Sequence, residues 1–298
     1  MAGRPPTVDA AAGLPAPAVR PYVRRYLGYR YLGFPPGVHV GLPSAWLTVV
    51  ISLDEPTRVA QTPGAAATAY AALAGGLDTR PVAIAHDGDQ YGVQLELSPL
   101  GCRGLLGLPA AGLARAVADL PDLLGQAPAR ELAERMAEGR SWASRFAVLD
   151  EVLGRAIRRD AGAPAAEVER AWRCVRDSGG AVGIGEMAAE IGWSRRHLTA
   201  RFTAEFGLTP KDVARVVRFE RAKRLLSGTA RPGLAETAVA CGYYDQAHLA
   251  RDWRELAGMP PSAWLAAGDL PPVEFGTDAA ASVRAGASAP DRGASGPR

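Results

Sequence analysis

Two short stretches of the sequence carry arginine, glutamine, threonine and alanine on what would be one face of a helix. In residues 195–206 the side chains of that face are Arg195, Arg196, Thr199, Ala200 and Thr203. In residues 246–257 they are Gln246, Ala247, Ala250, Arg251 and Arg254. Arginine and glutamine can form two hydrogen bonds at once to the edges of guanine and adenine, and small neighbours allow a helix to lie deep in a major groove. A solvated surface would explain either face alone, but the occurrence of two such faces favours contact with DNA bases.

The two faces occupy equivalent places in an internal repeat. Residues 183–210 (GIGEMAAEIGWSRRHLTARFTAEFGLTP) match residues 233–261 (GLAETAVACGYYDQAHLARDWRELAGMPP), with an offset of 50 before the turn and 51 after it. The matched pairs include Gly183/Gly233, Glu186/Glu236, Gly192/Gly242, His197/His248, Leu198/Leu249, Phe202/Trp253, Gly207/Gly258 and Pro210/Pro261. One residue is inserted in the turn, where Gly-Trp-Ser corresponds to Gly-Tyr-Tyr-Asp. The repeat indicates a duplicated supersecondary unit.

Each copy has the signals of a helix, a tight turn and a second helix. Gly192 and Gly242 suit the left-handed residue that ends a helix, and Ser194 and Asp245 suit the N-cap of the next one. Apolar side chains three and four apart then give each second helix a core face, with Leu198, Phe202 and Phe206 in the first copy and Leu249, Trp253 and Leu256 in the second. Two helices joined by a short turn that contains glycine form a helix-turn-helix motif.

The segment between the copies predicts a long helix that is rich in bases and shows these bases to solvent. Thr209 and Pro210 suit its N-cap and first position. From Ser194 to Arg231 there are ten bases and three acids, a net charge of +7, whereas the whole chain carries only +3. Such a helix is about 25–30 Å long at 1.5 Å per residue, and major grooves on one face of DNA recur every ~34 Å. The spacer could therefore hold two recognition helices, at about 195–206 and 246–257, in successive major grooves.

The first half of the chain has a different texture. Residues 46–53, 80–86 and 91–98 are strand-like, and the last two flank a hairpin-like turn at Asp87–Gln90. Residues 110–125, 128–139 and 141–160 have helical periodicity. The last of these carries an apolar stripe formed by Trp142, Phe146, Leu149, Val152, Leu153 and Ile157. That stripe either packs on its own domain or forms the seam of a dimer.

These textures predict an α+β chain with two domains. A small β-rich, barrel-like sensor domain with flanking helices is expected at residues 21–160, followed by a linker at 161–166. An all-α domain of two helix-turn-helix units joined by a long helix is expected at 167–268. Residues 1–20 and 276–298 are rich in Pro, Ala, Gly and Ser and are expected to be disordered tails. The first domain would sense a small-molecule signal or mediate dimerisation.

Composition excludes several other classes. No apolar run is long enough for a membrane span, and prolines occupy the place where a signal peptide has its apolar core, so a cytoplasmic protein without a membrane partner is expected. Cys102, Cys174 and Cys241 are isolated, and His39 and His86 lack metal-ligand spacing, so no metal, cofactor or catalytic residue is expected. The sequence predicts a protein that is not an enzyme.

Two alternatives stay open at this point. Arg103 lies next to Cys102 and could lower the pKa of its thiol, as in a DNA-binding sensor that works by alkyl transfer to cysteine. A non-specific architectural DNA binder is the other alternative, although it would need more total charge than +3. Thiol titration tests the alkyl-transfer sensor, because an unreactive Cys102 would exclude it. Binding in the presence of competitor DNA tests the architectural binder.

Residues 167–266 resemble the DNA-binding domain of the AraC/XylS family of bacterial transcription regulators. The stretch GYYDQAHLARDWRELAGMPPSAW is similar to the family's signature in the second unit, and GLTPKDVARVVRFERAKRLL is similar to its linker helix. The resemblance implies base-facing positions at Arg196, Thr199 and Ala200 in the first unit and at Gln246, Ala247 and Arg251 in the second. Ala200 departs from the longer polar residue that is common there, so the first helix would contact fewer bases.

The resemblance also implies partners and a source. Residues 1–160 resemble, with less specific motifs, the sensor halves of actinobacterial-type members, and the high arginine and alanine content suggests a GC-rich genome. The expected partners are double-stranded promoter or operator DNA and a small-molecule effector. A contact with RNA polymerase and a homodimer are compatible with the family resemblance.

Overall fold

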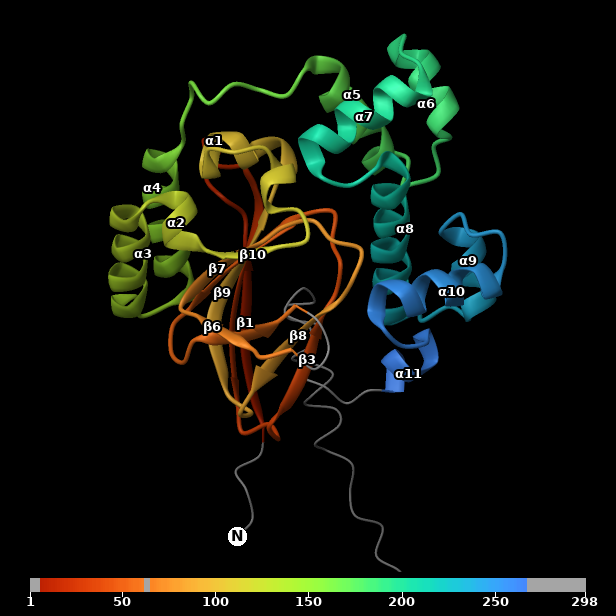
Figure 1. Ribbon diagram of the computed structural model, residues 1–298. Coiled ribbons are helices and arrows are strands. Elements are labelled where there is room, and N and C mark those ends of the chain that lie inside the picture. Colours follow the sequence, from red (N-terminus) through yellow and green to blue (C-terminus); the bar gives the residue numbers. More distant parts are fainter. Residues whose placement is uncertain (1–5, 62–64, 267–298) are drawn as a thin grey trace, which may run out of the picture.

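The computed structural model describes residues 6–61 and 65–266 and shows a β-rich N-terminal domain followed by a helical C-terminal domain (Figure 1). The tail expected at 276–298 lies outside the described residues. The strands are β1 Thr7–Gly13, β2 Val23–Leu32, β3 Gly37–Gly41, β4 Leu47–Ser52, β5 Thr57–Ala60, β6 Thr68–Tyr70, β7 Ala72–Gly75, β8 Val82–His86, β9 Gln90–Leu97 and β10 Val117–Asp119. The expected α+β fold class, with a β-rich domain before an all-helical one, is confirmed.

The strands form two antiparallel sheets. One sheet has the order β1-β2-β9-β4-β7-β10 and the other has the order β3-β8-β5-β6. Side chains alternate across the larger sheet, so that Leu47, Val49 and Ile51 of β4 are buried in the core while Thr48 and Val50 face a cavity that both sheets line. The larger sheet is therefore covered on one face by helices and on the other by the smaller sheet.

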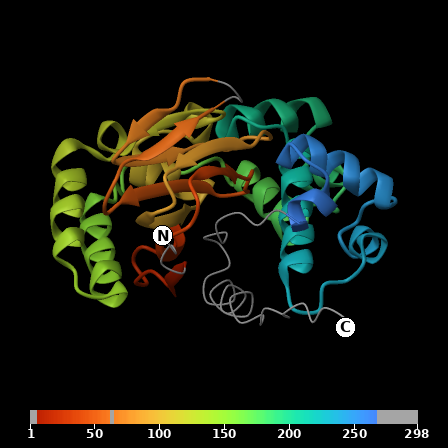
Figure 2. The ribbon, with the colours of Figure 1, turned by 90° about the horizontal axis from the view of Figure 1, so that it is seen from below.

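Short helices follow the strands along the chain. They are η1 Pro99–Gly101, α1 Cys102–Leu106, η2 Ala110–Leu113, α2 Leu120–Leu124, α3 Gln126–Glu138 and α4 Trp142–Ala156. Figure 2 shows α3 and α4 on one side of the β domain and the C-terminal helices on the opposite side. Ser141 caps α4 in a capping box with Ser144, which fixes where that helix begins.

The apolar stripe of α4 packs within its own chain. Leu149, Val152 and Leu153 are buried in the core, and Trp142 and Phe146 pack against it. A Cβ on Gly28 of β2 would lie 2.2 Å from the Trp142 ring, so this glycine allows the ring to lie against the sheet. Of the two interpretations of the stripe, the structure favours packing on the domain over a dimer seam.

The expectation that residues 1–20 form a disordered tail is wrong for the described part of that segment. Residues 7–13 form β1, which pairs antiparallel with β2 from Thr7↔Leu32 to Gly13↔Tyr26. Contacts with α4 add to the ladder, because Trp142 Nε1 donates to Asp9 Oδ2 at 3.2 Å and the Ala16 amide donates to Asp150 Oδ1 at 2.6 Å. A segment rich in alanine and proline is ordered here by distant partners.

Two further expectations for the N-terminal domain need correction. The segment 110–125 is not one helix but η2, β10 and α2, because Arg115 takes a left-handed conformation (φ 60°) and residues 117–119 then pair with β7. The strands at β8 and β9 exist, but they do not form a hairpin, since β8 pairs with β3 and β5 while β9 pairs with β2 and β4. The turn between β8 and β9 is bonded to the segment that follows β2, since Asp89 Oδ1 accepts a hydrogen bond from the Gly33 amide at 2.6 Å.

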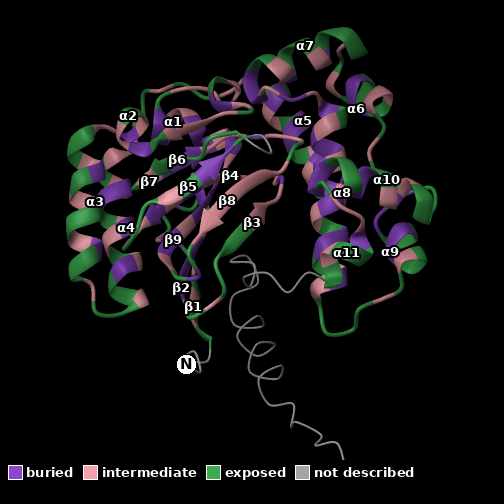
Figure 3. Ribbon diagram, turned by 60° about the horizontal axis from the view of Figure 1, so that its bottom comes forward, coloured by how far each residue is buried: buried purple, intermediate pink, exposed green. Residues whose placement is uncertain are grey.

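The C-terminal domain consists of seven helices in its described part. They are α5 Ala166–Asp177, α6 Ile184–Ile191, α7 Arg195–Phe206, α8 Pro210–Ser227, α9 Leu234–Ala240, α10 Gln246–Ala257 and α11 Pro261–Ala266. The long helix α8 connects the unit that contains α6 and α7 to the unit that contains α9 and α10 (Figure 1). Figure 3 shows α8 mostly buried or half-buried between these units. No described helix is both long enough and apolar enough to cross a membrane.

The two helix-turn-helix units have separate apolar cores. In the first, Trp172 of α5 packs on Phe202 and Phe206 of α7, with ring centroids 5.9 and 4.4 Å away. This core is continuous with that of the N-terminal domain. In the second, Phe219 of α8 packs on Trp253 of α10 at 4.9 Å within a core of its own. The first unit is therefore integrated with the β domain more closely than the second.

Candidate nucleic-acid interface

The two copies of the repeat have the same turn geometry. The Trp193 amide donates to the Ala188 carbonyl at 2.9 Å, and the Tyr243 amide donates to the Ala238 carbonyl at 2.9 Å. Because each of these positions is shifted by 50 residues, Trp193 and Tyr243 are equivalent, and the inserted residue is Tyr244. The insertion therefore lies directly before the cap of α10.

Side-chain caps fix the start of both candidate recognition helices. Ser194 Oγ accepts from the His197 amide at 3.2 Å, and Asp245 Oδ1 accepts from the His248 amide at 2.7 Å. At the other ends, Gly207 and Gly258 take left-handed conformations, with φ of 76° and 73°. The observed bounds of α7 and α10 coincide with the ranges expected from the sequence.

The side chains selected from the sequence lie on the outer faces of α7 and α10. Seven of them are exposed, namely Arg195, Arg196, Ala200, Gln246, Ala247, Arg251 and Arg254, and three are half-buried, namely Thr199, Thr203 and Ala250. In α7 the five selected residues, together with Ala204, line one shallow open depression on the protein surface. The structure therefore brings the selected residues of α7 together on one accessible face.

Two of these side chains are less available than their sequence positions suggested. The guanidinium of Arg195 packs over Gly185 of α6, where an added Cβ would lie 2.4 Å from Nη2. Thr203 Oγ1 is buried and has no hydrogen-bond partner in the described chain. Arg196, Thr199 and Ala200 are then the central residues of the first face.

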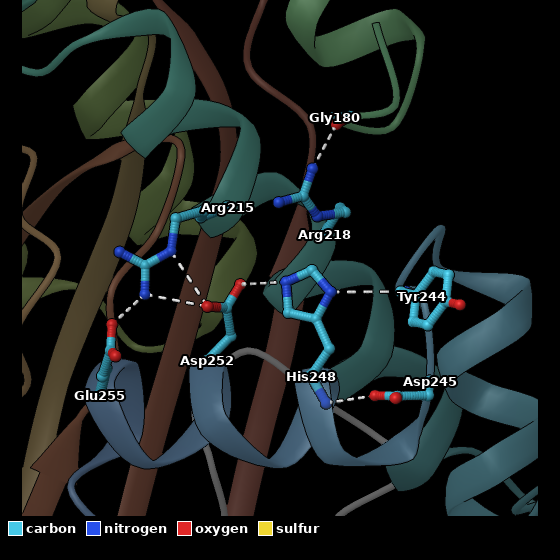
Figure 4. Close-up of polar contacts among 8 residues, drawn as sticks. All are labelled: Gly180, Arg215, Arg218, Tyr244, Asp245, His248, Asp252 and Glu255. Carbon is cyan, nitrogen blue, oxygen red and sulfur yellow. Dashed lines mark hydrogen bonds and ion pairs between the residues drawn. The ribbon is translucent and has the colours of Figure 1, made fainter. Parts of the chain in front are cut away.

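An arginine clamp holds α10 against the connecting helix. Arg215 of α8 donates to Asp252 Oδ1 through Nε at 3.1 Å and Nη2 at 3.0 Å, and it also contacts Glu255 (Figure 4). His248 Nε2 lies 4.0 Å from the other Asp252 oxygen. Asp252 is buried, so this clamp orients α10 from its inner side and leaves Arg251 and Arg254 on the outer side.

The run of bases between Ser194 and Arg231 is not one free patch. Arg215 is paired with acids of α10, and Arg218 Nη1 donates to the Gly180 carbonyl at 2.7 Å (Figure 4). Lys223 is buried. The expectation that the connecting helix shows its bases to solvent is therefore wrong for these three residues, because Arg215 and Arg218 are hydrogen-bonded within the domain and Lys223 is buried.

One exposed aromatic residue was missed by pattern analysis. Tyr244, the inserted residue, has 92% of its surface exposed beside the N-terminus of α10. A tyrosine presents a ring and a hydroxyl group that can contact a phosphate backbone. The change of offset from 50 to 51 was the sequence signal that marked this position.

Cys102 lacks the environment of a reactive thiol. Its side chain is fully buried in the core. Burial raises the pKa of the Cys102 thiol to about 12, with a smaller contribution from Glu205, and Arg103 acts in the opposite sense. The alkyl-transfer alternative is not favoured, because the thiolate is the reactive form and this site disfavours it.

A cavity of about 250 Å³ lies between the two sheets of the N-terminal domain. Apolar side chains that line it include Tyr29, Trp46 and Val59, and polar ones include His39, Gln94 and Arg115. The described residues contain no cluster of three or more side chains that could hold a metal ion. The mixed lining suits a small organic molecule that has both apolar and polar groups.

Comparison with known proteins gives one family match within the C-terminal domain and one curated relative. A family model described as a helix-turn-helix domain matches residues 187–267. Over 68 residues, the chain is 34% identical to an uncharacterized HTH-type transcriptional regulator, YbfI, of Bacillus subtilis (strain 168), and the match covers 23% of this chain and 24% of that protein. The chain thus matches about a quarter of the length of this curated relative.

Some similar solved structures match only about a third of the chain, and others match most of it. The DNA-binding domain of AdpA, solved in complex with a target DNA, is 29% identical with a TM-score of 0.30, and the match covers 35% of this chain and 90% of that one. ToxT from Vibrio cholerae O395 is 8% identical with a TM-score of 0.47, and the match covers 87% of this chain and 96% of that one. The family match and the two capped helix-turn-helix units together identify residues 187–267 as a helix-turn-helix domain of the AraC type.

Proposed function

We propose that the protein is a sequence-specific transcription regulator that places α7 and α10 in successive major grooves of one DNA site. The observation that carries this proposal is the occurrence of the same capped helix twice, each time with its arginine-, glutamine- and alanine-bearing face exposed. The 18 residues of α8 connect the two units, and at 1.5 Å per residue they span about 27 Å. That length suits two helices that enter grooves ~34 Å apart.

The selected side chains have different roles in this proposal. Arg196, Gln246 and Arg251 are long, exposed and able to form paired hydrogen bonds with base edges. Thr199, Ala200, Ala247 and Ala250 are small and allow close approach to the bases. Arg195 and Arg254 lie at the margins of the two faces, where phosphate contact is the expected role. Thr203 has a buried hydroxyl group and is given no contact with DNA.

The N-terminal domain is the regulatory part in this proposal. The cavity between its sheets would hold a small-molecule effector, and the division at residues 161–166 would separate sensing from DNA binding. The chain between α4 and α5 supports that division, since residues 157–165 form neither helix nor strand. A DNA-binding regulator works where the DNA is, so we place the protein in the cytoplasm.

The proposal includes two further partners, a second copy of the chain and RNA polymerase. A homodimer would need a surface other than the α4 stripe, because that stripe is covered by the sheet of its own domain. A contact with RNA polymerase would use the surface of the helical domain that faces away from DNA. The proposed activity is DNA binding without catalysis.

A binding titration tests the central function. The full-length protein is titrated onto a labelled duplex obtained by selection from random sequences and onto a scrambled duplex of the same length and composition. The proposal expects at least ~10³-fold tighter binding to the selected duplex at physiological salt. Equal affinity for both duplexes would support the architectural alternative and overturn sequence-specific regulation.

A further inference from the structure

A large cleft between the two domains has more arginines in its lining than residues of any other type. Its volume is about 1000 Å³, and its walls come from the N-terminal domain, the chain between α4 and α5, and the helices α5 and α8. Eight arginines and two glutamates line it. Each wall contributes, for example Arg24 from β2, Arg159 from the connecting chain, Arg176 from α5, and Arg221 and Arg224 from α8.

The positive charge of this cleft is only partly neutralised by the protein, since Arg24 and Arg176 pair with Glu96 and Asp177, which lie outside its lining. Of the two glutamates, Glu169 is already paired with Arg173 of its own helix. Glu220 accepts a hydrogen bond from Ser44 Oγ at 2.7 Å. In the part of the chain that the structure describes, no carboxylate forms an ion pair with Arg159, Arg221 or Arg224. Like charges in a concave site repel one another and focus a positive potential that attracts anions.

Trp46 positions arginines from both domains beside the cleft. The guanidinium carbons of Arg24 and Arg176 lie 4.9 and 5.6 Å from the centroid of its ring. Arg24 belongs to the N-terminal domain and Arg176 to the helical domain, so one aromatic ring holds a cation from each side. Trp46 also lines the cavity between the sheets, so an occupant of the cleft would lie next to the wall of that cavity.

We propose that this cleft binds a small polyanion, a molecule with two or more phosphate or carboxylate groups, and that the bound molecule holds the two domains together. Guanidinium groups form paired hydrogen bonds with both kinds of anion. The volume is that of a small-molecule site, and sites of this size commonly lie at domain interfaces. A DNA backbone fits less well, because the cleft is concave and walled by both domains. The site is separate from the outer faces of α7 and α10, so the inference goes beyond the proposed function.

Calorimetric titration of the full-length protein with tripolyphosphate tests the proposal without DNA. The cleft variant is Arg221→Gln with Arg224→Gln. Its matched control is Arg130→Gln with Arg140→Gln, which removes the same charge from exposed positions outside the cleft. We expect one site per chain in the wild type, at least a tenfold rise of the Kd in the cleft variant, and no change in the control. A parallel titration with citrate compares carboxylate with phosphate.

Three results would overturn the proposal. The first is the absence of saturable binding of both probes. The second is an equal loss of affinity in the cleft variant and the control, which would show attraction by net charge alone. The third is a tenfold loss of affinity for a scrambled duplex in the cleft variant but not in the control, measured without probe. That result would assign Arg221 and Arg224 to the DNA backbone. If the protein binds tripolyphosphate but does not bind DNA, the result supports the anion site and contradicts the proposed function.

Discussion

Arg103 binds Glu205 through two hydrogen bonds, from Nε to Oε1 at 2.9 Å and from Nη2 to Oε2 at 2.7 Å. Arg103 belongs to α1 of the N-terminal domain, and Glu205 belongs to the last turn of α7. The carboxylate is buried, whereas the arginine side chain is 31% exposed. The pair therefore connects the N-terminal domain directly to one of the two helices proposed to contact DNA.

A double-mutant cycle on this pair measures the connection. Arg103→Met, Glu205→Gln and the double variant are compared with the wild type by denaturant unfolding. Hydrogen bonds to charged groups contribute ~1.5–3 kcal/mol, and solvent screening at Arg103 reduces this, so we expect a coupling free energy of about 1 kcal/mol. Additive effects of the two substitutions would show that the pair does not stabilise the contact between the domains.

Gly207 and Gly258 form a matched pair that tests how α7 is held. Both are left-handed C-caps, so alanine at either position costs roughly 1 kcal/mol of conformational strain. A Cβ on Gly207 would lie 2.2 Å from the Ala114 Cβ of the N-terminal domain, whereas one on Gly258 would lie 3.6 Å from Pro81 Cγ. We expect Gly207→Ala to lower the free energy of unfolding by ~1–3 kcal/mol more than Gly258→Ala. Equal losses in the two variants would contradict the close contact at α7.

Arg251 tests the assignment of a base contact. Arg251→Ala should weaken binding to the selected duplex by ~1–3 kcal/mol and relax the preference at one base position. Arg130→Ala, on the exposed surface of α3, is the control and should leave affinity unchanged. Affinities of each variant for the selected and scrambled duplexes are measured by anisotropy. An equal loss on both duplexes would make Arg251 a phosphate contact.

The recognition helices were predictable because their signals are local. Ser194 and Asp245 cap the helices that follow them, Gly207 and Gly258 end them, and the apolar periodicity identifies their inner faces. The repeat supplied an internal check, since each signal occurs twice. For these reasons the bounds of α7 and α10 and the exposure of most selected side chains follow from the sequence.

The features that the sequence did not reveal depend on distant partners. Residues 7–13 form a strand because they pair with the edge of β2 and contact Trp142 of α4. The alanine-rich sequence of this segment does not indicate either contact. Residues 117–119 lie in a segment with helical periodicity, but pairing with β7 decides their conformation. Likewise, Arg215 lies in a base-rich segment, and its partner Asp252 is 37 residues away, so its neighbours in the sequence do not show that it is paired.

Thiol chemistry provides a test of the Cys102 environment. Because burial raises the pKa of this thiol to about 12, roughly one molecule in ten thousand carries the thiolate at pH 8. Native protein treated with a disulfide reagent at pH 8 should therefore leave Cys102 unmodified, while the half-buried Cys174 reacts first. Peptide mapping identifies the modified residue. Rapid modification of Cys102 in the folded protein would revive the alkyl-transfer alternative.

The most direct test of the central claim is selection of bound sequences from random duplexes by the purified full-length protein. Two recognition helices on one connecting helix predict a single enriched site with two half-elements whose centres are about one helical turn, 10–10.5 base pairs, apart. Insertion of five base pairs between the half-elements should then remove most of the affinity, because it turns the second groove to the opposite side of the duplex. Enrichment of one short element alone, or an affinity that the insertion does not change, would contradict simultaneous binding by α7 and α10.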